Sequence, residues 1–592
     1  MGYEKTKALN PSAGTGYELP TYAFEVPPEL AIPLISDHPT HPVVIVGAGL
    51  AGLTAACDFA LRGIAAIVID EDDTVGVKGA SSRGICYAQK SLEVFRRLGI
   101  YDRIKAKGVE WSVGKTLAGD DIVYEFDLAK QESHNVSEQP PFINLQQFYL
   151  EWFLADRLQE LGVSKVRWQS RVKKVEQFVN HVLLDIETPQ GSYQCKAKWL
   201  IDASGLRSPI REASGLKVEQ SLGVDRWCIS DVRFKDKKPV ERWTWIEAPF
   251  NDDKAVWQHL MADDVWRLDY QMQPDADPEY VSSPEVVAER LKRHLGEDVE
   301  FELIWVGPYA YRSHLLETFR KDRIFFVGDC AHVMSPFGAR GGNSAIQDAD
   351  NLVWKLASVL EGKAHEGILD SYSDERREGA QINIQITNRT ARFLSPRTPV
   401  EKMTRNAVIE LAKKFPFARA LVNTGRLSTA NTYREKPLCV SGKASVPIQN
   451  CAVQPFNGFT DLMSIVEKHH YRPLLIAFSL DAQNAALKRG LSEAYLVEQF
   501  STQPILLLSE GDSNAHSDNL SQLTVWQKVV VSETNYARLI YDFGITAGGG
   551  FAEQLGLLRP DLYGAGLLDL NAIEEQLLSL GLKTVASQKV AA

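Results

Sequence analysis

Short apolar runs near the start of the chain alternate with a helical pattern. The run Val43–Val46 is typical of a buried strand, and apolar Leu53, Ala56 and Ala60 then recur at helical spacing. A second apolar run, Ala66–Asp70, follows. The pattern predicts a strand, a helix and a second strand, which is the start of a βαβ unit.

The pattern then changes several times along the chain. Helical spacing recurs near Ser91–Leu98 and over Leu145–Leu161, and alternation through Val166–Leu200 predicts meandering strands. A further apolar strand, Ile324–Val327, precedes a Gly-rich turn and a helix with one apolar face. The chain therefore contains two strand–turn–helix segments far apart in sequence.

The region between these two segments has a different character. It is rich in Trp, and the strand-like runs Ala255–Met261 and Val265–Met272 flank an Ala-Asp-Asp turn, which predicts an inserted antiparallel sheet. A stretch with little pattern, Arg434–Asn450, precedes a last region with strand candidates Pro473–Phe478 and Pro504–Leu508. We predict an α/β protein with five segments: an N-terminal extension (1–41), the first part of a nucleotide-binding domain (42–214), a substrate-binding sheet domain (215–312), the second part of the nucleotide-binding domain (313–433) and a C-terminal α/β domain (434–592).

Composition and charge narrow the function classes. The 592 residues are 44% apolar and 24% charged with a net charge of −11, which argues against a nucleic-acid partner. Met1–Pro42 has no signal-peptide core, and no apolar run reaches the length of about eighteen residues that spans a bilayer. The seven cysteines are odd in number and widely spaced, so we expect neither disulfides nor a metal site. We expect a cytoplasmic protein.

The first Gly-rich turn reads Gly47-Ala-Gly49-Leu-Ala-Gly52 and lies between a strand and a helix. Gly47 permits a tight turn, Gly49 lets the backbone approach a pyrophosphate, and Gly52 lets the helix pack closely on the strand. Free N–H groups at the helix start attract the anion. Asp70 ends the second strand, where an acid binds a ribose hydroxyl. Together these features predict a dinucleotide site.

The second Gly-rich turn begins at Gly328-Asp329 and runs to Asn343. Asp329 can accept hydrogen bonds from polyol hydroxyls, and the N–H groups around Gly341–Asn343 can stabilise negative charge on a reduced flavin ring. One long dinucleotide held by both turns would explain why the chain has two.

The run GDCAHVMSPFGARGGNSAIQDADNLVWKL resembles the GD motif of class A flavoprotein monooxygenases, the para-hydroxybenzoate hydroxylase family. The resemblance covers about Pro42–Leu411. A third motif, Asp202 to Arg211, resembles the family's DG motif, except that Ser204 stands where the family has Asp, which weakens the nicotinamide inference more than the FAD one. The tail resembles a subgroup similar to 3-(3-hydroxyphenyl)propionate hydroxylases, whose C-terminal domain is thioredoxin-like.

The resemblance and the glycine turns together imply bound FAD with transient NADH or NADPH. Under the resemblance, Arg83 lies near the adenosine and phosphates, Gln147 faces the flavin and Pro336 lies near the isoalloxazine. The residues expected to bind FAD are Gly47, Gly49, Leu50, Ala51, Gly52, Asp70, Glu71, Arg83, Gln147, Asp329, Pro336, Gly338, Gly341, Gly342 and Asn343.

The resemblance further implies a reaction. Oxygen adds to reduced flavin, and the C4a-hydroperoxide hydroxylates a small aromatic, most readily a phenol, while the protein excludes water and helps to deprotonate the substrate. Pro336 and three residues of the inserted sheet, His259, Asp269 and Tyr270, are the catalytic candidates, with Tyr309 and Tyr311 as further candidates for contact with substrate. Strand alternation places His259 on the face of Trp257, and Asp269 on that of Arg267.

Other interpretations stay open. The same fold supports epoxidation, halide oxidation or dehydrogenation, and a non-catalytic flavin-binding protein is a second class. Trp243-Thr-Trp245-Ile does not have the spacing of a halogenase motif. His332 is expected to orient the second turn, the Trp residues to pack in a core, and the tail to serve packing or a homodimer contact. The aromatic substrate and the choice between NADH and NADPH are left undetermined.

Overall fold

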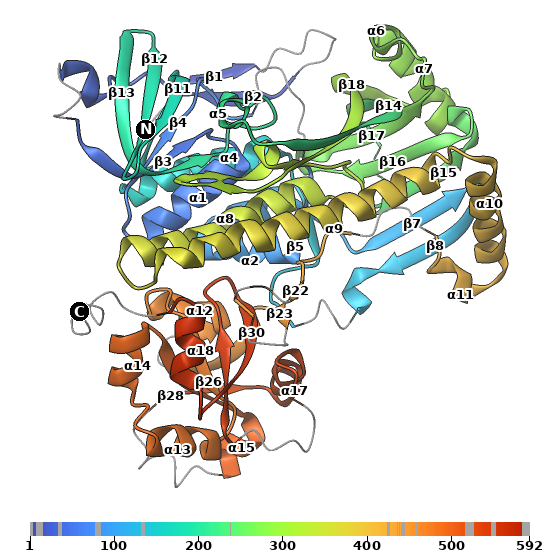
Figure 1. Ribbon diagram of the computed structural model, residues 1–592. Coiled ribbons are helices and arrows are strands. Elements are labelled where there is room, and N and C mark those ends of the chain that lie inside the picture. The colour runs from blue at the N-terminus through green and yellow to red at the C-terminus, as the bar shows by residue number, and fades with distance from the viewer. Residues whose placement is uncertain are drawn as a thin grey trace. The chain divides into compact units, whose positions relative to one another are not determined.

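The computed structural model describes residues 4–7, 16–32, 38–76, 84–131, 136–236, 238–422, 427–434, 436, 438–439, 444–456, 459–515, 526–545 and 552–582. These fall into two compact units (Figure 1). Unit 1 comprises residues 1–134, 140–349 and 380–429, and unit 2 comprises residues 135–139, 350–379 and 430–592. The domain boundaries expected from the sequence stay predictions.

The first sheet of unit 1 contains the predicted βαβ start. Its strands are β3 (Thr40–Val46), β4 (Ala66–Ile69), β10 (Lys165–Arg167), β11 (Arg171–Gln177), β12 (Val182–Thr188), β13 (Gly191–Asp202), β19 (Arg320–Lys321) and β20 (Ile324–Phe326). β3 pairs in parallel with β4 and β13, and β13 pairs in parallel with β20. The parallel strands β3 and β20 thus bring both glycine turns to the carboxyl edge of one sheet, where α/β proteins bind ligands.

The helices of unit 1 include those that follow the turns. They are α1 (Leu50–Leu61), α2 (Gln89–Leu98), α3 (Tyr101–Lys107), α4 (Gln147–Leu161) and α5 (Pro209–Ser214). α8 (Arg340–Leu360) begins in unit 1 and ends in unit 2, and α9 (Asp370–Leu394) begins in unit 2 and ends in unit 1. α1 is buried from Leu50 to Ala60 because its small and apolar residues let it pack closely on all sides. The predicted helices near Ser91–Leu98 and Leu145–Leu161 are confirmed.

The second sheet of unit 1 is the predicted antiparallel insertion, enlarged. Its order is β21-β18-β14-β17-β16-β15-β7-β8. The strands are β7 (Val113–Ala118), β8 (Asp121–Asp127), β14 (Val218–Phe234), β15 (Arg242–Ala248), β16 (Lys254–Leu260), β17 (Val265–Met272), β18 (Phe301–Leu316) and β21 (His332–Val333). The hairpin of β16 and β17 is confirmed, whereas β7 and β8 join from an earlier part of the chain and were not foreseen.

The two faces of this sheet differ. One face packs Leu268 and Tyr270 against α6 (Pro278–Val281) and α7 (Pro284–Leu295) in an apolar core. The opposite face carries Trp227 and Trp257 in a second cluster, to which α9, α10 (Pro399–Lys414) and α11 (Pro416–Arg419) contribute apolar side chains. The second face carries the residues of the candidate active site.

The described part of the N-terminal segment belongs to unit 1. Its elements are β1 (Glu4–Lys7), β2 (Glu18–Thr21) and η1 (Pro28–Ala31). Tyr17 and Leu19 are buried, and the Tyr17 hydroxyl donates to Asp231 on β14 at 2.9 Å. A three-stranded sheet of β5 (Cys86–Ala88), β9 (Phe142–Asn144) and β6 (Val109–Glu110) lies in the same unit.

Unit 2 contains a seven-stranded sheet with the order β22-β23-β30-β29-β26-β27-β28. The strands are β22 (Tyr433–Arg434), β23 (Ala444–Pro447), β26 (Leu474–Ala477), β27 (Gln503–Ser509), β28 (Gln527–Val531), β29 (Gln554–Leu558) and β30 (Tyr563–Asp569), besides the hairpin β24 (Ala452–Phe456) and β25 (Phe459–Asp461). The helices are α12 (Leu462–Lys468), α13 (Leu480–Lys488), α14 (Glu493–Phe500), α15 (Glu510–Ala515), α17 (Glu533–Asp542) and α18 (Ile573–Ser579). Both predicted strands of this region are confirmed, and β23 lies in the stretch expected to be a linker. No helix in the described part of the chain is long and apolar enough to cross a membrane.

Candidate active site

The first glycine turn requires the absence of side chains at two positions. Gly47 has a φ of +107°, and a Cβ atom there would lie 2.4 Å from the carbonyl oxygen of Ala203 at the end of β13. A Cβ atom on Gly52 would lie 2.0 Å from the carbonyl oxygen of Gly47. The close approach of β3, β13 and α1 therefore depends on these glycines, as the sequence indicated.

Asp70 lies beside this turn, whereas Glu71, the other acid expected there, does not join it. The carboxylate of Asp70 accepts from the backbone N–H of Ala48 at 2.6 Å and of Asp72 at 2.8 Å. Burial raises the pKa of Asp70 to about 6 despite these bonds. Glu71 is exposed and pairs with Arg171 at 3.3 Å. Arg83 lies outside the described residues.

The second glycine turn is held by a buried acid on α8. Asp348 accepts from the backbone N–H of Gly328 at 3.0 Å, and Nε2 of His332 lies 2.7 Å from the same carboxylate oxygen. His332 thus orients the loop, as expected. Asp329 is exposed between these anchors, and Pro336 is exposed at the far side of the loop.

The two turns lie against each other. A Cβ atom on Gly328 would stand 3.3 Å from Cβ of Ala51, and one on Gly342 would stand 3.5 Å from the side chain of Leu50. The same atom on Gly341 would meet no described residue within 4 Å. Two helix N-termini with free N–H groups therefore converge next to open space, and this set of groups fits an anionic dinucleotide such as FAD.

Gln147 and Glu151 line the first turn from α4. Gln147 donates to Glu151 at 2.8 Å and accepts from the backbone N–H of Gly84 at 3.1 Å, and Glu151 also accepts from Gly76 at 2.8 Å. Glu151 is buried, and one of its oxygens lies 3.8 Å from where a Cβ on Gly49 would stand. Glu151 was not among the residues predicted from the sequence, although its spacing of four from Gln147 on a helix places both on one face.

Asn343 joins the start of α8 to the strand before α2. Its carbonyl oxygen accepts from the backbone of Ala88 at 2.9 Å and from Ser91 at 2.7 Å. Its amide donates to the carbonyl oxygens of Cys86 at 2.9 Å and Ala339 at 2.6 Å. The side chain is fully used inside the protein, so only the backbone of Asn343 is available to a ligand.

A polar group lies on the sheet face that the sequence pointed to. In the register of β16 and β17, Trp257 is opposite Asp269 and His259 is opposite Arg267. Arg267 is in turn opposite Asp231 on β14 and binds it with two hydrogen bonds of 2.9 and 3.1 Å. Residues opposite one another in a sheet share a face, so the predicted alternation is confirmed.

Several polar atoms on this face are buried without a hydrogen-bond partner among the described residues. They are Oδ1 of Asp269, Nδ1 of His259, Nε of Arg242 and the indole N–H groups of Trp227 and Trp257. Buried polar atoms are nearly always paired, so five together indicate a place for a bound molecule or water. We name Arg242, His259, Asp269, Trp227 and Trp257 the sheet-face cluster.

The cluster lies between the sheet and the second glycine turn. The Phe337 ring, next to Pro336, is 4.9 Å from the Trp257 ring and 6.2 Å from the Trp227 ring. Cys86 on β5 lies within electrostatic range of Arg242 and Arg267, whose charges oppose the effect of burial, and burial raises the pKa of its thiol to about 11. Phe337 thus connects the cluster to the second glycine turn.

The electrostatics of the cluster are set by burial. Burial raises the pKa of Asp269 to about 7, although Arg267 and Arg242 oppose this. Burial, Arg242 and Arg267 hold the pKa of His259 well below its usual value, so the imidazole is neutral. Burial also lowers the pKa of Arg242. Arg242 and Cys86 were missed because their place depends on strand partners far away in sequence.

The tyrosine candidates lie elsewhere. Tyr270 follows Asp269 and therefore points to the opposite face, where its hydroxyl lies 3.0 Å from Nδ1 of His294. Tyr311 packs 5.0 Å from Phe337 within the Trp cluster, and Tyr309 is partly exposed beside it. Tyr270 is thus not brought together with His259 and Asp269.

The third motif is a buried capping arrangement. Asp202, at the end of β13, accepts from the backbone N–H of Ser204 at 3.0 Å and from the hydroxyls of Ser204 and Ser208. Burial raises the pKa of Asp202. Ser204 therefore donates hydrogen bonds to the buried carboxylate of Asp202. Arg207 is exposed, whereas Arg211 is buried and donates to the carbonyl oxygen of Cys330.

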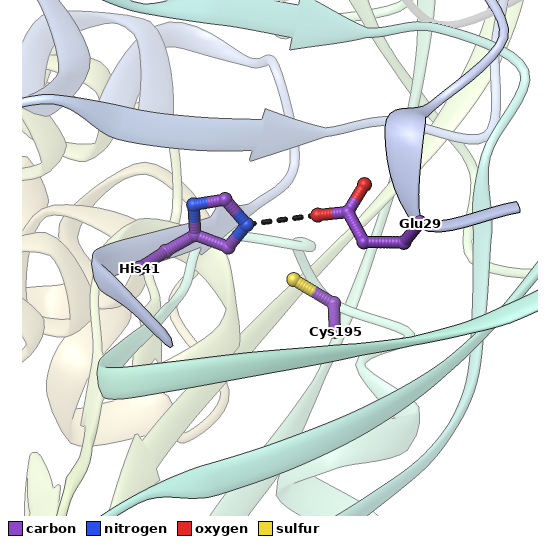
Figure 2. Close-up of side chains that lie close together, drawn as sticks. All are labelled: Glu29, His41 and Cys195. Carbon is purple, nitrogen blue, oxygen red and sulfur yellow. Dashed lines mark hydrogen bonds and ion pairs between the residues drawn. The ribbon is translucent and has the colours of Figure 1, made fainter. Parts of the chain in front are cut away.

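One group among the described residues has the ligand types of a metal site: Glu29, His41 and Cys195. Figure 2 shows the His41 imidazole bonded to Glu29 with the thiol of Cys195 nearby. Arg167 also donates to the same Glu29 oxygen at 3.0 Å. Burial would raise the pKa of Glu29, but His41 and Arg167 outweigh it and hold it at about 2. The guanidinium already supplies the positive charge, so the group fastens η1 to β3 and β10 as an ion-pair network.

The fold and these turns define a flavin-binding class, and comparison with known families agrees. Residues 40–387 match the model described as FAD binding domain, and the chain belongs to this family. FAD is therefore the cofactor of this fold.

The chain is similar to two named groups of proteins. It is 27% identical over 399 residues to a 3-(3-hydroxy-phenyl)propionate/3-hydroxycinnamic acid hydroxylase of Mycolicibacterium gilvum, covering 66% of this chain and 67% of the relative. The like-named protein of Klebsiella pneumoniae is 26% identical over 419 residues, covering 70% and 74%. Among solved structures, the flavin-dependent monooxygenase PieE in complex with FAD and substrate has a TM-score of 0.71 at 19% identity, covering 92% of this chain and 98% of that one. Aklavinone-11 hydroxylase with FAD and aklavinone has a TM-score of 0.68 at 20% identity, covering 92% and 99%.

Proposed function

We propose that this protein is a FAD-dependent monooxygenase that uses NADH or NADPH and O2 to hydroxylate a small phenolic aromatic. The observation that carries the proposal is the sheet-face cluster, whose unpartnered polar atoms lie beside the second of two converging glycine turns. The hydroxylase names of the relatives support it.

We infer that the glycine turns hold FAD along its length. Asp70 would accept hydrogen bonds from the ribose, the N-terminus of α1 would hold the pyrophosphate, and Asp329 would bind the ribityl chain. Pro336 and the backbone from Gly338 to Asn343 would hold the isoalloxazine. Glu151 joins this set because its buried carboxylate stands next to Gly49.

The residues of the chain position the substrate, exclude water from it and transfer its proton. Bound FAD supplies the redox chemistry, because it accepts hydride from the nicotinamide and carries oxygen transfer. Trp227, Trp257 and Phe337 form an aromatic wall that excludes water and stacks a ring. The polar atoms of the cluster orient the ring by its hydroxyl group.

The substrate class follows from the relatives and the cluster. Those relatives are named for 3-(3-hydroxyphenyl)propionate, a phenol with a carboxylate side chain. The buried guanidinium of Arg242, whose Nε has no hydrogen-bond partner among the described residues, favours a ligand oxygen with negative charge, such as that of a phenolate. We propose that hydroxylated phenylpropanoids of this kind are the first substrates to test.

The C-terminal region is proposed to be a thioredoxin-like domain without a redox role. Support comes from its strands: β26 and β27 form a parallel β-α-β unit, and β29 and β30 follow as an antiparallel β-β-α unit. No cysteine pair follows β26 in the sequence. The homodimer predicted from the sequence stays a prediction, which light scattering would check.

The test is NAD(P)H oxidation by the purified yellow protein with a phenol panel and product analysis. A monooxygenase shows substrate-stimulated NAD(P)H consumption with one hydroxylated product per coupled turnover. A dehydrogenase or epoxidase gives another product, and a flavin-binding protein gives none. A colourless protein after supplementation with FAD would remove the basis of the proposal.

A further inference from the structure

We propose that Asp269 is the base that removes the phenolic proton of the substrate, and that Arg242 beside it holds the phenolate so formed. This inference rests on the proposed function and goes beyond it, because it assigns a proton-transfer step to named atoms. The substrate O–H bond breaks, the proton moves to Oδ1 of Asp269, and the electron pair stays on the phenol oxygen facing Arg242.

The placement of the two side chains comes from the sheet register. Trp257 is opposite Asp269 on one side and opposite Thr244 of β15 on the other. Arg242 lies two residues before Thr244 and therefore shares that face. Asp269 and Arg242 thus approach one space from neighbouring parts of the sheet, with the Trp257 indole between their strands.

Asp269 and Arg242 each have a buried polar atom that can hydrogen-bond to a ligand. Oδ1 of Asp269 and Nε of Arg242 have no partner among the described residues, whereas the neighbouring pair Arg267 and Asp231 is fully engaged. A phenol hydroxyl satisfies both at once, since it donates to the carboxylate and accepts from the guanidinium. Transfer of the proton then leaves the total charge of the pocket unchanged.

Other titratable groups around Asp269 are less suited to the task. The groups that face it are Arg267 on the same strand, Asp231 on β14, Arg242 on β15, His259 on β16 and Cys86 on β5. His259 is a poor base because two guanidinium groups disfavour its protonated form. Asp269 gains from burial when it takes up a proton, and its raised pKa of about 7 makes it a stronger base than an ordinary carboxylate.

The test uses two readouts on the FAD-loaded full chain and the variants Asp269→Asn and Arg242→Gln. The first is the absorbance of bound p-nitrophenolate at pH values below 7, which needs no turnover. We expect Arg242→Gln to bind a smaller ionised fraction than the wild type, because it removes the positive charge that faces the phenolate, and Asp269→Asn to bind no smaller a fraction, because it removes a negative charge. Asp264→Asn, an exposed carboxylate in the same hairpin, is the matched control and should behave as the wild type.

The second readout is the pH profile for 3-(3-hydroxyphenyl)propionate. The wild-type rate should rise with pH through about 7, the pKa of Asp269, since only the ionised carboxylate accepts the proton. Asp269→Asn should be about 100-fold slower at pH 7. Its rate should rise only at alkaline pH, where the phenol of the substrate ionises in solution. A ring-fluorinated analogue, whose phenol is more acidic, should recover most of the lost rate.

Two results would overturn the assignment: an unchanged bound phenolate fraction in Arg242→Gln, or an equal loss of rate in Asp269→Asn for the parent and the fluorinated phenol. The first would remove the role of Arg242, and the second would give Asp269 a structural role only, with the monooxygenase intact. Failure of the proposed function is distinct, because it shows in the wild type as absent flavin colour or absent phenol-stimulated NAD(P)H oxidation.

Discussion

Gly52 is the position at which the first turn depends most directly on a missing side chain. Its added Cβ would lie 2.0 Å from a backbone oxygen, which cannot move without opening the contact of α1 with β3. We predict that Gly52→Ala lowers FAD affinity about tenfold or more, since overpacking costs about 1–3 kcal/mol. The ratio of flavin to protein absorbance in the purified variant measures this.

Gly490 offers the control for that substitution. It also needs a positive φ, of +80°, but its added Cβ meets no described atom within 4 Å. Gly490→Ala should cost only about 1 kcal/mol of backbone strain and keep full flavin content. Equal flavin content in both variants would show that the first turn does not contact the cofactor.

The residues found from sequence alone are those whose role is local. Gly47, Gly52 and Asp70 follow from one strand–turn–helix pattern, and the face shared by His259 and Asp269 follows from alternation of period two. Arg242 could not be found in this way, because its place depends on the pairing of β15 with β16. The spacing of Glu151 from Gln147 is local, but it does not show that α4 packs beside the first turn. Tyr270 was a candidate by proximity in sequence, but the same alternation sends it to the opposite face.

At the scale of secondary structure, elements that depend on a local pattern were likewise predicted, whereas pairings between distant strands were not. The strands of the β16–β17 hairpin were predicted within a few residues, and a helix was predicted after the second turn, where α8 lies. The pairing of β7 with β15 was not predicted, because the sequence of a strand does not indicate which distant strand will pair with it in parallel. The N-terminal segment was predicted only as an extension, and the hydrogen bond from its Tyr17 hydroxyl to the buried Asp231 of a distant strand was not foreseen.

Asn343 connects α8 to the β5–α2 segment and yields a prediction for these elements. Asn343→Ala leaves the Ala88 N–H and the Cys86 carbonyl without their buried partner. We expect a loss of roughly 2–4 kcal/mol in the free energy of unfolding, measured with urea, and faster release of flavin. Ser91→Ala removes only one of the four bonds and should cost about 1 kcal/mol. Equal losses in the two variants would contradict the connecting role of Asn343.

Over the whole chain, family membership and compact units do not coincide. The family match ends at residue 387, whereas residues 350–379 belong to the same unit as the C-terminal region. Within unit 2 a fully buried network explains this. Glu375 binds Arg559 at 2.7 Å and Lys355 at 2.9 Å, and Arg559 also binds Asp561 at 2.6 Å. The charges of the two cations and two anions cancel. Residues 350–379 and the C-terminal strands are therefore held together by ion pairs between them.

This network predicts a pH dependence of the stability of unit 2. Burial would raise the pKa of Glu375, but Arg559 and Lys355 outweigh it and hold it at about 2, below the usual value of 4.5. A depressed pKa stabilises the fold above pH 4.5, and this contribution is lost as the pH falls towards 2. Glu375→Gln should cost about 3–5 kcal/mol at pH 7, because it leaves buried cations uncompensated, and the gap from wild type should narrow as the pH falls. Urea unfolding at a series of pH values measures both, with exposed Glu575→Gln on α18 expected within about 0.5 kcal/mol of wild type. A gap that stays constant with pH would mean that the charge of Glu375 does not hold the two segments together.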